Sequence, residues 1–407
     1  MDMGTIMNTM RDPAGIPSHP VLFQVLMIVT WILHIAFVHL TLGAAALAIY
    51  GFYRRGRNPY WERLSMAMTK TAKVGVSLLI VLGVAPLLFT QVIYDPQWYT
   101  ASVLSARWLI AFIFTLIIGY CSWFVFYYGN HEGARQRLGL FALVGLALFL
   151  LDGLIMHVLA YQSLLPEQWM SWYAPGGVVD TRGAALHAIQ WPRYLFIISL
   201  SLPVVGLYLL AYADYFAHRA DRAADYLAFA RTLGKRLALV GIGISILMLL
   251  VWLAVLPGAS GLRLHPVGGL LALSLAAVAW LVRRYAQRGY GYALLGTGLL
   301  PLCVLAVWRE VIRIRYLQPF GYDITQYPTH YDWPSTILFF LTLLGVGGLV
   351  GGFFITLIYR AGQVQGMYTA TPTVARLGTA AVVVLGVWLA VFFAYGIAIW
   401  MRHAFAI

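Results

Sequence analysis

One uncharged segment constrains the fold of this chain more than any other feature of its sequence. Residues 20–53 include no aspartate, glutamate, lysine or arginine, and about 20 apolar residues are enough for a helix to cross a bilayer. Two histidines, His34 and His39, interrupt the segment. An ionisable side chain at that depth marks a functional site by default, and neutral imidazole is a good ligand for iron. The segment therefore predicts a membrane helix that carries a cofactor ligand.

The same apolar character extends through the whole chain. Hydrophobic residues make up 61% of the 407 residues and charged residues 10%, compared with about 25% charged residues in soluble domains. We predict an all-α polytopic membrane protein, a bundle of about ten transmembrane helices. The predicted spans are residues 21–53, 64–92, 103–128, 138–164, 188–216, 237–256, 267–282, 290–308, 334–359 and 374–401. The seventh is short enough to be re-entrant, which leaves nine spans as the alternative.

The chain shows no internal repeat or linker. We therefore predict a polar N-terminal segment over residues 1–19 and a single transmembrane domain over residues 20–407. The N-terminal segment lacks the apolar core of a cleavable signal peptide. Cys121 and Cys303 both lie in apolar spans, which excludes a disulfide framework and a cysteine metal motif. The formal net charge of +13 does not indicate nucleic-acid binding, because the chain has no basic, aromatic-rich polar domain.

Arginine and lysine residues alternate between the loops. The loops after odd-numbered spans are rich in them: Arg54, Arg55, Arg57, Arg63, Lys70 and Lys73, then Arg135 and Arg137, then Arg219, Arg222, Arg231, Lys235 and Arg236, then Arg283, Arg284 and Arg288, and finally Arg360 and Arg376. The opposite loops contain fewer, chiefly Arg107, Arg182, Arg193 and Arg263. Because basic loops stay in the cytoplasm, we predict a protein of the inner (cytoplasmic) membrane with both termini facing outward.

One outward segment departs from this charge pattern. Arg309, Glu310, Arg313 and Arg315 follow the eighth span, and long aromatic loops occupy residues 165–187 and 318–333. Loops of that length are usually functional or covered by a partner. Arginines at a helix end also snorkel to the membrane interface. The segment is therefore either a helix end or a surface for an anionic cofactor edge or an acidic partner.

Motifs in the first two spans carry a family resemblance. They are His34, Phe37 and Thr41-Leu42-Gly43 in the first span, Met68-Thr69-Lys70 and Leu82-Gly83-Val84-Ala85 in the second, and Trp98 after it. This pattern resembles subunit I of the cytochrome bd quinol oxidases over residues 20–220. The resemblance implies a haem-ligating histidine at His34. Residues 221–407 would then be additional helices, with an outer loop near residues 309–333.

The sequence departs from that family at positions tied to oxygen chemistry. Arg107 stands where the family's third helix begins with a glutamate implicated in proton delivery, and Gln91 replaces an acidic residue. The family's second haem histidine falls near Tyr194, with His187 seven residues earlier. The family's Gly-Arg-Gln-Pro-Trp segment has no counterpart. We therefore expect no bd-type oxygen reduction by the isolated chain.

Four histidines are candidates for binding the cofactor. His34 is predicted at mid-bilayer, and His157 and His187 near the outer ends of the fourth and fifth spans; these three are the candidate iron ligands. His39 lies about 140° around the helix from His34, so the two do not face the same haem. The alternative for each histidine is a core side chain that is hydrogen-bonded to a backbone carbonyl.

Several charged side chains are candidates for further roles. Asp152, five residues before His157, is either a proton relay or a buried structural acid. Arg107 and Arg193 begin the third and fifth spans, where their guanidinium groups either match haem propionates or anchor helix ends. Arg309 is a candidate for the same anionic edge.

Two further patterns concern the last spans. Glu310 is the acid beside the arginine cluster, and is therefore the candidate acid–base group for a quinol. The ninth span is rich in glycine, which predicts close helix packing. These glycines are Gly345, Gly347, Gly348, Gly351 and Gly352.

We predict a b-type haem subunit of a respiratory electron-transfer complex, which moves electrons between the quinone pool and an outward-facing redox partner. The cofactors would be one or more b haems, with quinone or quinol as the substrate. The partner would be a c-type cytochrome or an iron–sulfur subunit, because this chain lacks the CxxCH motif of covalent haem. A haem-free membrane anchor and a proton or small-solute transporter are the alternatives.

Overall fold

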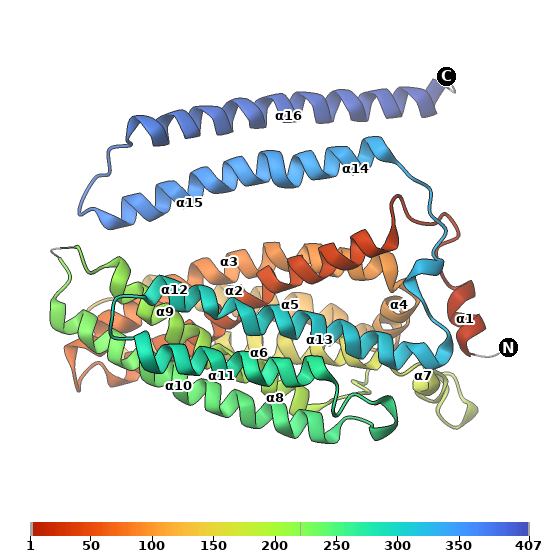
Figure 1. Ribbon diagram of the computed structural model, residues 1–407, viewed down its shortest axis with the longest axis horizontal. Helices are drawn as coiled ribbons and strands as arrows, with labels where there is room; N and C mark the ends of the chain where they lie inside the picture. The colour runs from red at the N-terminus through yellow and green to blue at the C-terminus, as the bar shows by residue number, and fades with distance from the viewer. Residues whose placement is uncertain (1–2, 220, 406–407) are drawn as a thin grey trace.

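The structure is a computed structural model that describes residues 3–219 and 221–405 (Figure 1). These residues form helices joined by loops, and contain no β-strand beyond one isolated bridge between Ile16 and Thr329. Ten helical segments in this part of the chain are long and apolar enough to cross a membrane. The predicted fold class is confirmed: the chain is a multi-pass, all-α membrane protein.

The spans follow one another in sequence order. They are α2 (Pro20–Arg54), α3 (Pro59–Ile93), α5 (Ala106–Gly129), α6 (Gly139–Gln162), α8 (Trp191–Ser199) with α9 (Ser201–Tyr215), α10 (Ala224–Val255), α11 (Pro266–Tyr285), α12 (Gly291–Thr297) with α13 (Leu299–Leu317), α14 (Trp333–Phe340) with α15 (Gly347–Gln363), and α16 (Pro372–Phe405). Helix α11 is continuous over 20 residues, which favours ten spans over the nine-span alternative.

The helix ends follow local sequence signals. Asn58 caps α3 by accepting a hydrogen bond from the Tyr60 amide at 2.8 Å, and Pro59 begins the helix, where a missing N–H carries no penalty. Helix α10 begins at Ala224, well before the predicted start at residue 237. Its first turns contain charged residues that form helix readily in water, so hydropathy alone places the start too late.

Helices α2 to α13 form one packed bundle. Small residues let its helices approach closely: a Cβ atom at Gly206 of α9 would overlap the backbone nitrogen of Ala238 in α10 and lie 2.7 Å from the carbonyl oxygen of Gly234. Large side chains fill the remaining space, and Trp123, Trp252 and Trp308 are fully buried. This bundle is the part of the protein that encloses a cavity.

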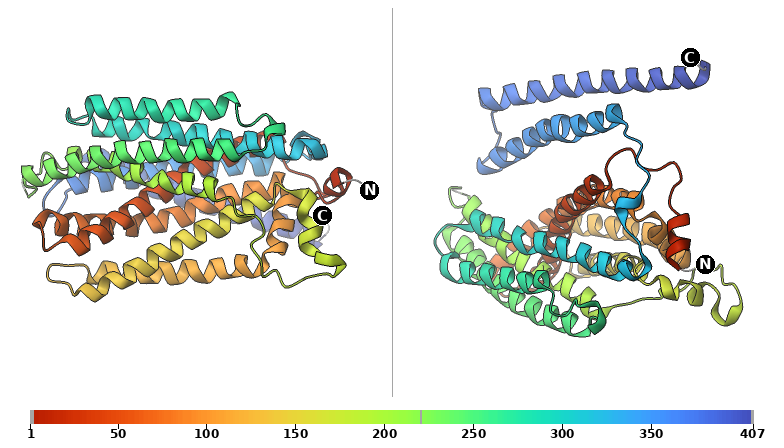
Figure 2. Two further views of the ribbon diagram at one scale, coloured as in Figure 1. Left: turned by 90° about the horizontal axis from the view of Figure 1, so that it is seen from below. Right: turned by 45° about the vertical axis from the view of Figure 1, so that its right-hand side comes forward.

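Helices α14, α15 and α16 form a hairpin that lies apart from the bundle (Figures 1 and 2). A π-helical stretch, Leu341–Val346, joins α14 to α15. The hairpin contacts the bundle near its two ends, where the Tyr215 hydroxyl donates to the Tyr359 carbonyl oxygen at 2.7 Å and the Phe339 ring lies 6.2 Å from that of Phe89.

The glycines of the ninth span do not pack against another helix. Cβ atoms added at Gly345, Gly348, Gly351 and Gly352 would meet nothing within 4 Å, and one at Gly347 would meet only the carbonyl oxygen of Thr342. The prediction of close packing there is therefore wrong within the described chain, because the hairpin turns this stretch away from the bundle.

The predicted polar N-terminal segment is folded over one end of the bundle. Short helices α1 (Met3–Thr9), α4 (Asp95–Leu104) and α7 (Pro166–Tyr173) lie at this end (Figure 1). The Ile16 amide donates to the Pro328 carbonyl oxygen at 2.9 Å, which ties the segment to the loop before α14. We call this end the cap end.

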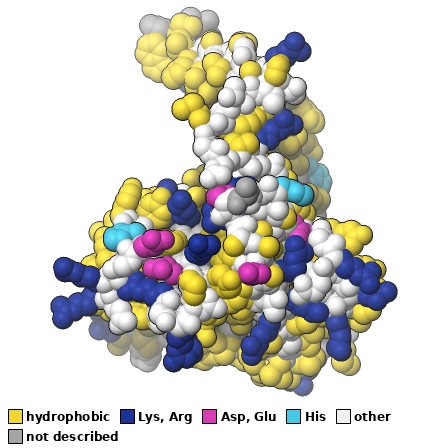
Figure 3. Space-filling model, turned by 90° about the vertical axis from the view of Figure 1, so that its left-hand side faces the viewer, with side chains coloured by type: hydrophobic (Ala, Val, Ile, Leu, Met, Phe, Trp, Pro, Cys, Tyr) yellow, Lys and Arg dark blue, Asp and Glu magenta, His cyan; other side chains and the backbone are white. Residues whose placement is uncertain are grey.

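Lysine and arginine side chains gather at the opposite end (Figure 3). That end carries the loops after α2, α5, α9, α11 and α15, which the charge pattern predicts to be cytoplasmic. All the basic loops therefore share one end of the molecule, as the positive-inside rule requires of a membrane protein.

Candidate functional site

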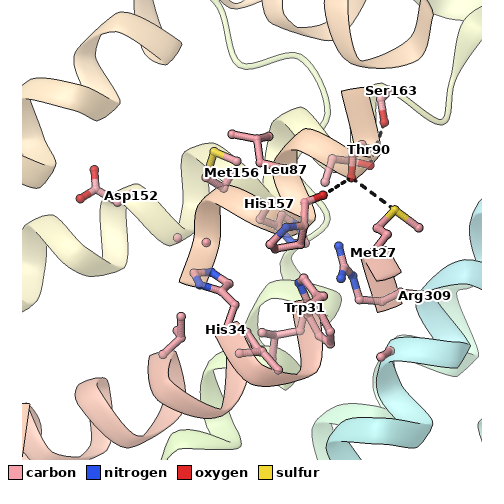
Figure 4. A pocket seen from close by; sticks show the side chains of 18 of the residues that line it. Met27, Trp31, His34, Leu87, Thr90, Asp152, Met156, His157, Ser163 and Arg309 are labelled. Atoms are coloured by element: carbon pink, nitrogen blue, oxygen red, sulfur yellow. Dashed lines mark hydrogen bonds between the residues drawn. The ribbon is translucent and has the colours of Figure 1, made fainter. Parts of the chain in front are cut away.

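A cavity of about 450 Å³ lies inside the bundle. Helices α2, α3, α6, α8 and α13 contribute most of its wall, and its size is typical of ligand pockets, which measure about 300–1,000 Å³. The lining is mostly apolar, with a few polar groups directed inward (Figure 4). We call this the inner cavity. Six of the nine predicted site residues line it: His34, Asp152, His157, Arg193, Arg309 and Glu310.

His34 projects from α2 into the inner cavity. Its Nδ1 atom lies 2.9 Å from the carbonyl oxygen of Leu79 in α3. If Nδ1 carries the proton, this bond fixes the ring and leaves Nε2 with a free lone pair. Gly83 makes room for the ring, since a Cβ atom there would lie 2.9 Å from the His34 Cε1 atom. The Leu79 carbonyl oxygen and the space at Gly83 therefore hold the His34 ring with its second nitrogen toward the cavity.

His157 on α6 is buried, and its ring also reaches the inner cavity (Figure 4). Both ring nitrogens are buried and lack a hydrogen bond of normal geometry within the described residues, and the backbone of Gln190 interacts with the ring. Its ring packs edge-on against that of Tyr194 at 5.5 Å between centroids. A buried polar group without a full partner is costly, which makes His157 a candidate ligand at the wall of the cavity.

Two arginines direct positive charge into the same space. Arg193 of α8 is 6% exposed, and its Nη1 atom is buried without a hydrogen-bond partner within the described chain. The guanidinium of Arg309 in α13 lies 3.9 Å from the centre of the Trp31 ring, and no carboxylate within the described residues forms an ion pair with it. The inner cavity is therefore prepared for an anionic ligand.

Asp152 is an isolated acid at the far side of the inner cavity from Arg309 (Figure 4). Its Oδ1 atom accepts a hydrogen bond from the Thr115 hydroxyl at 2.5 Å. Its Oδ2 atom is buried and has no partner within the described part of the chain. One oxygen of this carboxyl is thus free to exchange a proton with a cavity ligand.

Glu310 has the opposite environment, because three donors surround it. Its Oε1 atom accepts hydrogen bonds from the Gln24 amide at 2.7 Å and the Tyr94 hydroxyl at 2.5 Å. Its Oε2 atom accepts from Arg313 at 2.7 Å in an ion pair whose side chains are 13% (Arg313) and 7% (Glu310) exposed. These bonds hold the Glu310 carboxyl group in a fixed position at the wall of the inner cavity.

A second pocket of about 710 Å³ lies at the cap end. It is bounded by the start of α2, the end of α13 and the loop of residues 318–326. We call it the cap pocket. Tyr94 and Leu317 line both this pocket and the inner cavity. Gln24 lines only the cap pocket, whereas Glu310 lines only the inner cavity.

Three predicted site residues lie outside both pockets. His39 is fully buried, with Nδ1 3.2 Å from the Ser201 hydroxyl. His187 lies in the loop before α8, stacked on Trp172 with ring centroids 5.1 Å apart. Arg107 is exposed at the start of α5. The structure therefore separates these three from the other candidate ligands.

The three arginines of residues 309–315 differ in their exposure and do not form one surface. Arg309 faces the inner cavity and Arg313 is held by Glu310, so these two are not exposed. Arg315 is exposed and lies 3.4 Å from the Gln318 side chain. The end of α13 therefore turns two of the three arginines inward and leaves Arg315 on the surface.

Three residues of the site were not predicted. Trp31 carries the Arg309 guanidinium, and Tyr94 and Gln24 hold Glu310. Gln24 had a usable signal, because a side-chain amide in an otherwise apolar span is expensive unless it has a partner. Tyr94 had none, since aromatic residues at span ends are common, and Trp31 had none because an aromatic side chain inside an apolar span needs no polar partner to be stable there.

The described residues contain no group of three or more histidine, cysteine, aspartate or glutamate side chains that could hold a bare metal ion. Two histidines at one apolar cavity form a different arrangement. Haem iron needs one or two protein ligands from above and below its ring, so the donor set suits haem rather than a side-chain metal cluster.

Comparisons with known proteins give a fold assignment. No protein-family model matches the sequence, and no curated protein matches it. Among solved structures, a chain in the structure of bd oxidase from Geobacillus thermodenitrificans matches with a TM-score of 0.61 and 13% sequence identity, over 84% of this chain and 98% of that chain. The likeness confirms the predicted resemblance at the level of the fold. It covers 84% of the chain and so extends past residue 220, where the resemblance stated from the sequence ends.

Proposed function

We propose that this chain is a haem-binding subunit of a membrane electron-transfer system and that its electron donor or acceptor is a quinone. The observation that carries the proposal is the convergence of His34, His157, Arg193 and Arg309 on one apolar cavity inside the bundle. Separate parts of the sequence supply these residues, and each brings a group that haem binding uses. The fold that the chain shares with a bd oxidase structure is consistent with this function.

His34 and His157 would hold the iron. The Leu79 carbonyl oxygen orients His34, and His157 makes no hydrogen bond of normal geometry within the described residues. Arg193 and Arg309 would pair with the two propionates, since guanidinium groups bind carboxylates through paired hydrogen bonds. The apolar wall between them fits a porphyrin ring, which is held mainly by contact with apolar side chains. The residues present therefore fit the group.

The haem, when bound, would supply one-electron redox chemistry. The chain's own residues would place it, exclude water from it and handle protons nearby. Glu310 would accept protons from a quinol, because its carboxyl group lines the inner cavity and three donors hold it in a fixed position there. Asp152 would exchange a proton through its free Oδ2 atom.

The membrane and the partner belong to the same proposal. The basic end of the bundle would face the cytoplasm of a cell with an inner membrane, which places the cap end and both termini outside. An outward redox partner, a c-type cytochrome or an iron–sulfur subunit, would then meet the cap end. Its docking would use Arg315 and the aromatic loops, since Arg309 and Arg313 face inward.

A visible spectrum of the purified protein tests the proposal. We expect a reduced-minus-oxidised band of b haem, which His34→Ala removes because an alkyl side chain offers no lone pair to iron. His157→Ala should remove or shift the band. His187→Ala is the matched control and should leave the band unchanged, because its ring lies outside the cavity, stacked on Trp172. A colourless wild-type protein, or a full spectrum in the His34 variant, would overturn the proposal.

A further inference from the structure

The wall between the inner cavity and the cap pocket is thin and polar. Tyr94 and Leu317 line both spaces, and between them the wall includes the Glu310 carboxylate on the cavity side and Gln24 on the pocket side. Gln24 and Tyr94 donate to the same Glu310 oxygen, at 2.7 and 2.5 Å. Burying the Glu310 carboxylate between the two cavities carries a desolvation penalty. An apolar wall would separate the cavities without that penalty.

We propose that Glu310 and Tyr94 relay protons through this wall, from the inner cavity to the cap pocket. The inference rests on the proposed quinol chemistry. A quinol that is oxidised in two one-electron steps, with each electron passing through the haem site to the redox partner, also releases two protons and becomes a quinone. Each proton would first go to Glu310, which lines the cavity. The Tyr94 hydroxyl, which donates to Glu310 in this structure, would then turn toward the cap pocket and give its proton to water there. Its oxygen would take the proton of the Glu310 carboxyl in exchange. The carboxylate and the hydroxyl are thereby restored for the next proton.

Tyr94 is suited to this role and Gln24 is not. A phenol hydroxyl both donates and accepts a hydrogen bond, whereas a side-chain amide nitrogen only donates. The Tyr94 ring is fixed by the Arg313 guanidinium, 4.4 Å from its centre, and by a stacked Tyr322 ring at 6.0 Å. Arg313 also holds the second oxygen of Glu310. The hydroxyl therefore has a fixed position between the two spaces.

Tyr94 and Gln24 donate to the same Glu310 oxygen, so removing each donor in turn gives a matched pair of variants. Tyr94→Phe removes only the hydroxyl and keeps the ring under Arg313. Gln24→Leu removes the other donor to the same oxygen and keeps a similar volume. If the wall is only structural, the two variants should behave alike. If it relays protons, Tyr94→Phe alone should slow proton release by about 100-fold or more, the scale at which a positioned acid or base contributes.

The measurement needs a reporter at each end of the molecule. In a variant without Cys121 and Cys303, a pH-sensitive dye is attached to a cysteine at Gln326, which is exposed beside the cap pocket, or at Gln287, which is exposed at the basic end. The purified protein is mixed with a quinol, and haem absorbance and dye signal are followed together. We expect the dye at Gln326 to respond first in the wild type, and this response to be delayed in Tyr94→Phe but not in Gln24→Leu.

The outcomes separate the two proposals. Absence of the haem band in the wild type overturns both the function and the relay. A haem band that quinol does not reduce overturns the relay alone. Haem reduction with equal proton release in Tyr94→Phe and Gln24→Leu, or with first arrival at Gln287, overturns the relay alone. Glu310→Gln should also delay the signal. Because that variant leaves Arg313 without its carboxylate and can fail to fold, Tyr94→Phe is the deciding variant.

Discussion

The bundle of α2 to α13 and the hairpin of α14 to α16 have similar hydropathy but differ in how much of their surface is buried against protein. The most apolar windows of the ninth and tenth spans have mean hydropathies of 2.2 and 2.5, close to the 2.1 of the span formed by α8 and α9. Yet none of the residues in the two hairpin windows is buried, against 56% of those in α8 and α9. Hydropathy thus measures suitability for lipid and says little about packing against protein.

The reason is that lipid and a neighbouring helix are similar surroundings for an apolar side chain. A membrane helix gains little from moving its leucines from lipid to protein, so association depends on close fit, hydrogen bonds and small residues. In the bundle, Gly206 lets α9 and α10 approach closely. In the hairpin, Gly348 faces open space. The bundle can therefore enclose a cavity with fixed polar groups, whereas the hairpin presents most of its surface to its surroundings.

The same substitution in the two regions should have unequal effects. Gly206→Ala would bring a methyl group against the backbone of α10, which cannot move aside as a side chain can. We expect it to lower the free energy of unfolding by about 1–3 kcal/mol. Gly348→Ala adds its methyl group to open space and should change this free energy by less than about 0.5 kcal/mol. Denaturant titration of both variants in micelles measures the difference. Equal losses would show that the hairpin is packed as tightly as the bundle.

A hydrogen bond inside the hairpin should fix the distance between its helices and have no effect on the bundle. The Trp388 indole N–H donates to the Thr342 hydroxyl at 2.7 Å, which ties α16 to the π-helical stretch. Trp388→Phe removes this bond, worth about 1 kcal/mol, and should broaden the distance distribution between spin labels at Gly351 and Gly386. The haem spectrum should not change. Trp280→Phe, at an exposed position on α11, is the control; an unchanged distribution in Trp388→Phe would refute the tie.

The smallest effect that we expect is in the pH dependence of local stability, which should have opposite signs at the start of α4 and at the start of α14. Burial raises the pKa of the Asp95 carboxyl, which begins α4 at the cap end of the bundle. Hydrogen bonds to Ser335 lower the pKa of Asp332, which caps α14 at the start of the hairpin. A raised carboxyl pKa means that the folded state holds the proton more tightly, so α4 should gain stability as pH falls through that pKa toward the ordinary value of 3.8. The start of α14 should lose stability as pH falls below the ordinary value through its lowered pKa.

Amide hydrogen exchange of the two helix starts against pH, corrected for the intrinsic exchange rate, measures these slopes. Asp95→Asn and Asp332→Asn should each flatten the profile of their own helix and leave the other unchanged. Profiles of the same sign at the two sites would contradict the assigned environments.

The spans and most helix ends follow from the sequence, because they depend on local properties. A run of apolar residues commits a segment to the membrane, and once there its backbone must satisfy its own hydrogen bonds as a helix. Caps such as Asn58 and prolines such as Pro59 then set the start. The arrangement of basic residues is also local, and the structure gathers them at one end (Figure 3).

The site depended on the tertiary structure. His34, His39, His157 and His187 were all candidates from the sequence, but only His34 and His157 reach the inner cavity. The residues that meet at the site are far apart in the sequence. Of the donors to Glu310, for example, Gln24 is 286 residues away in the chain and Tyr94 is 216 residues away. A helical repeat indicates which residues share a face, but both lipid and protein neighbours accept an apolar face. Which face turns inward is decided only when distant helices pack together, and that packing placed a carboxylate, a phenol and two unpaired arginines around one cavity.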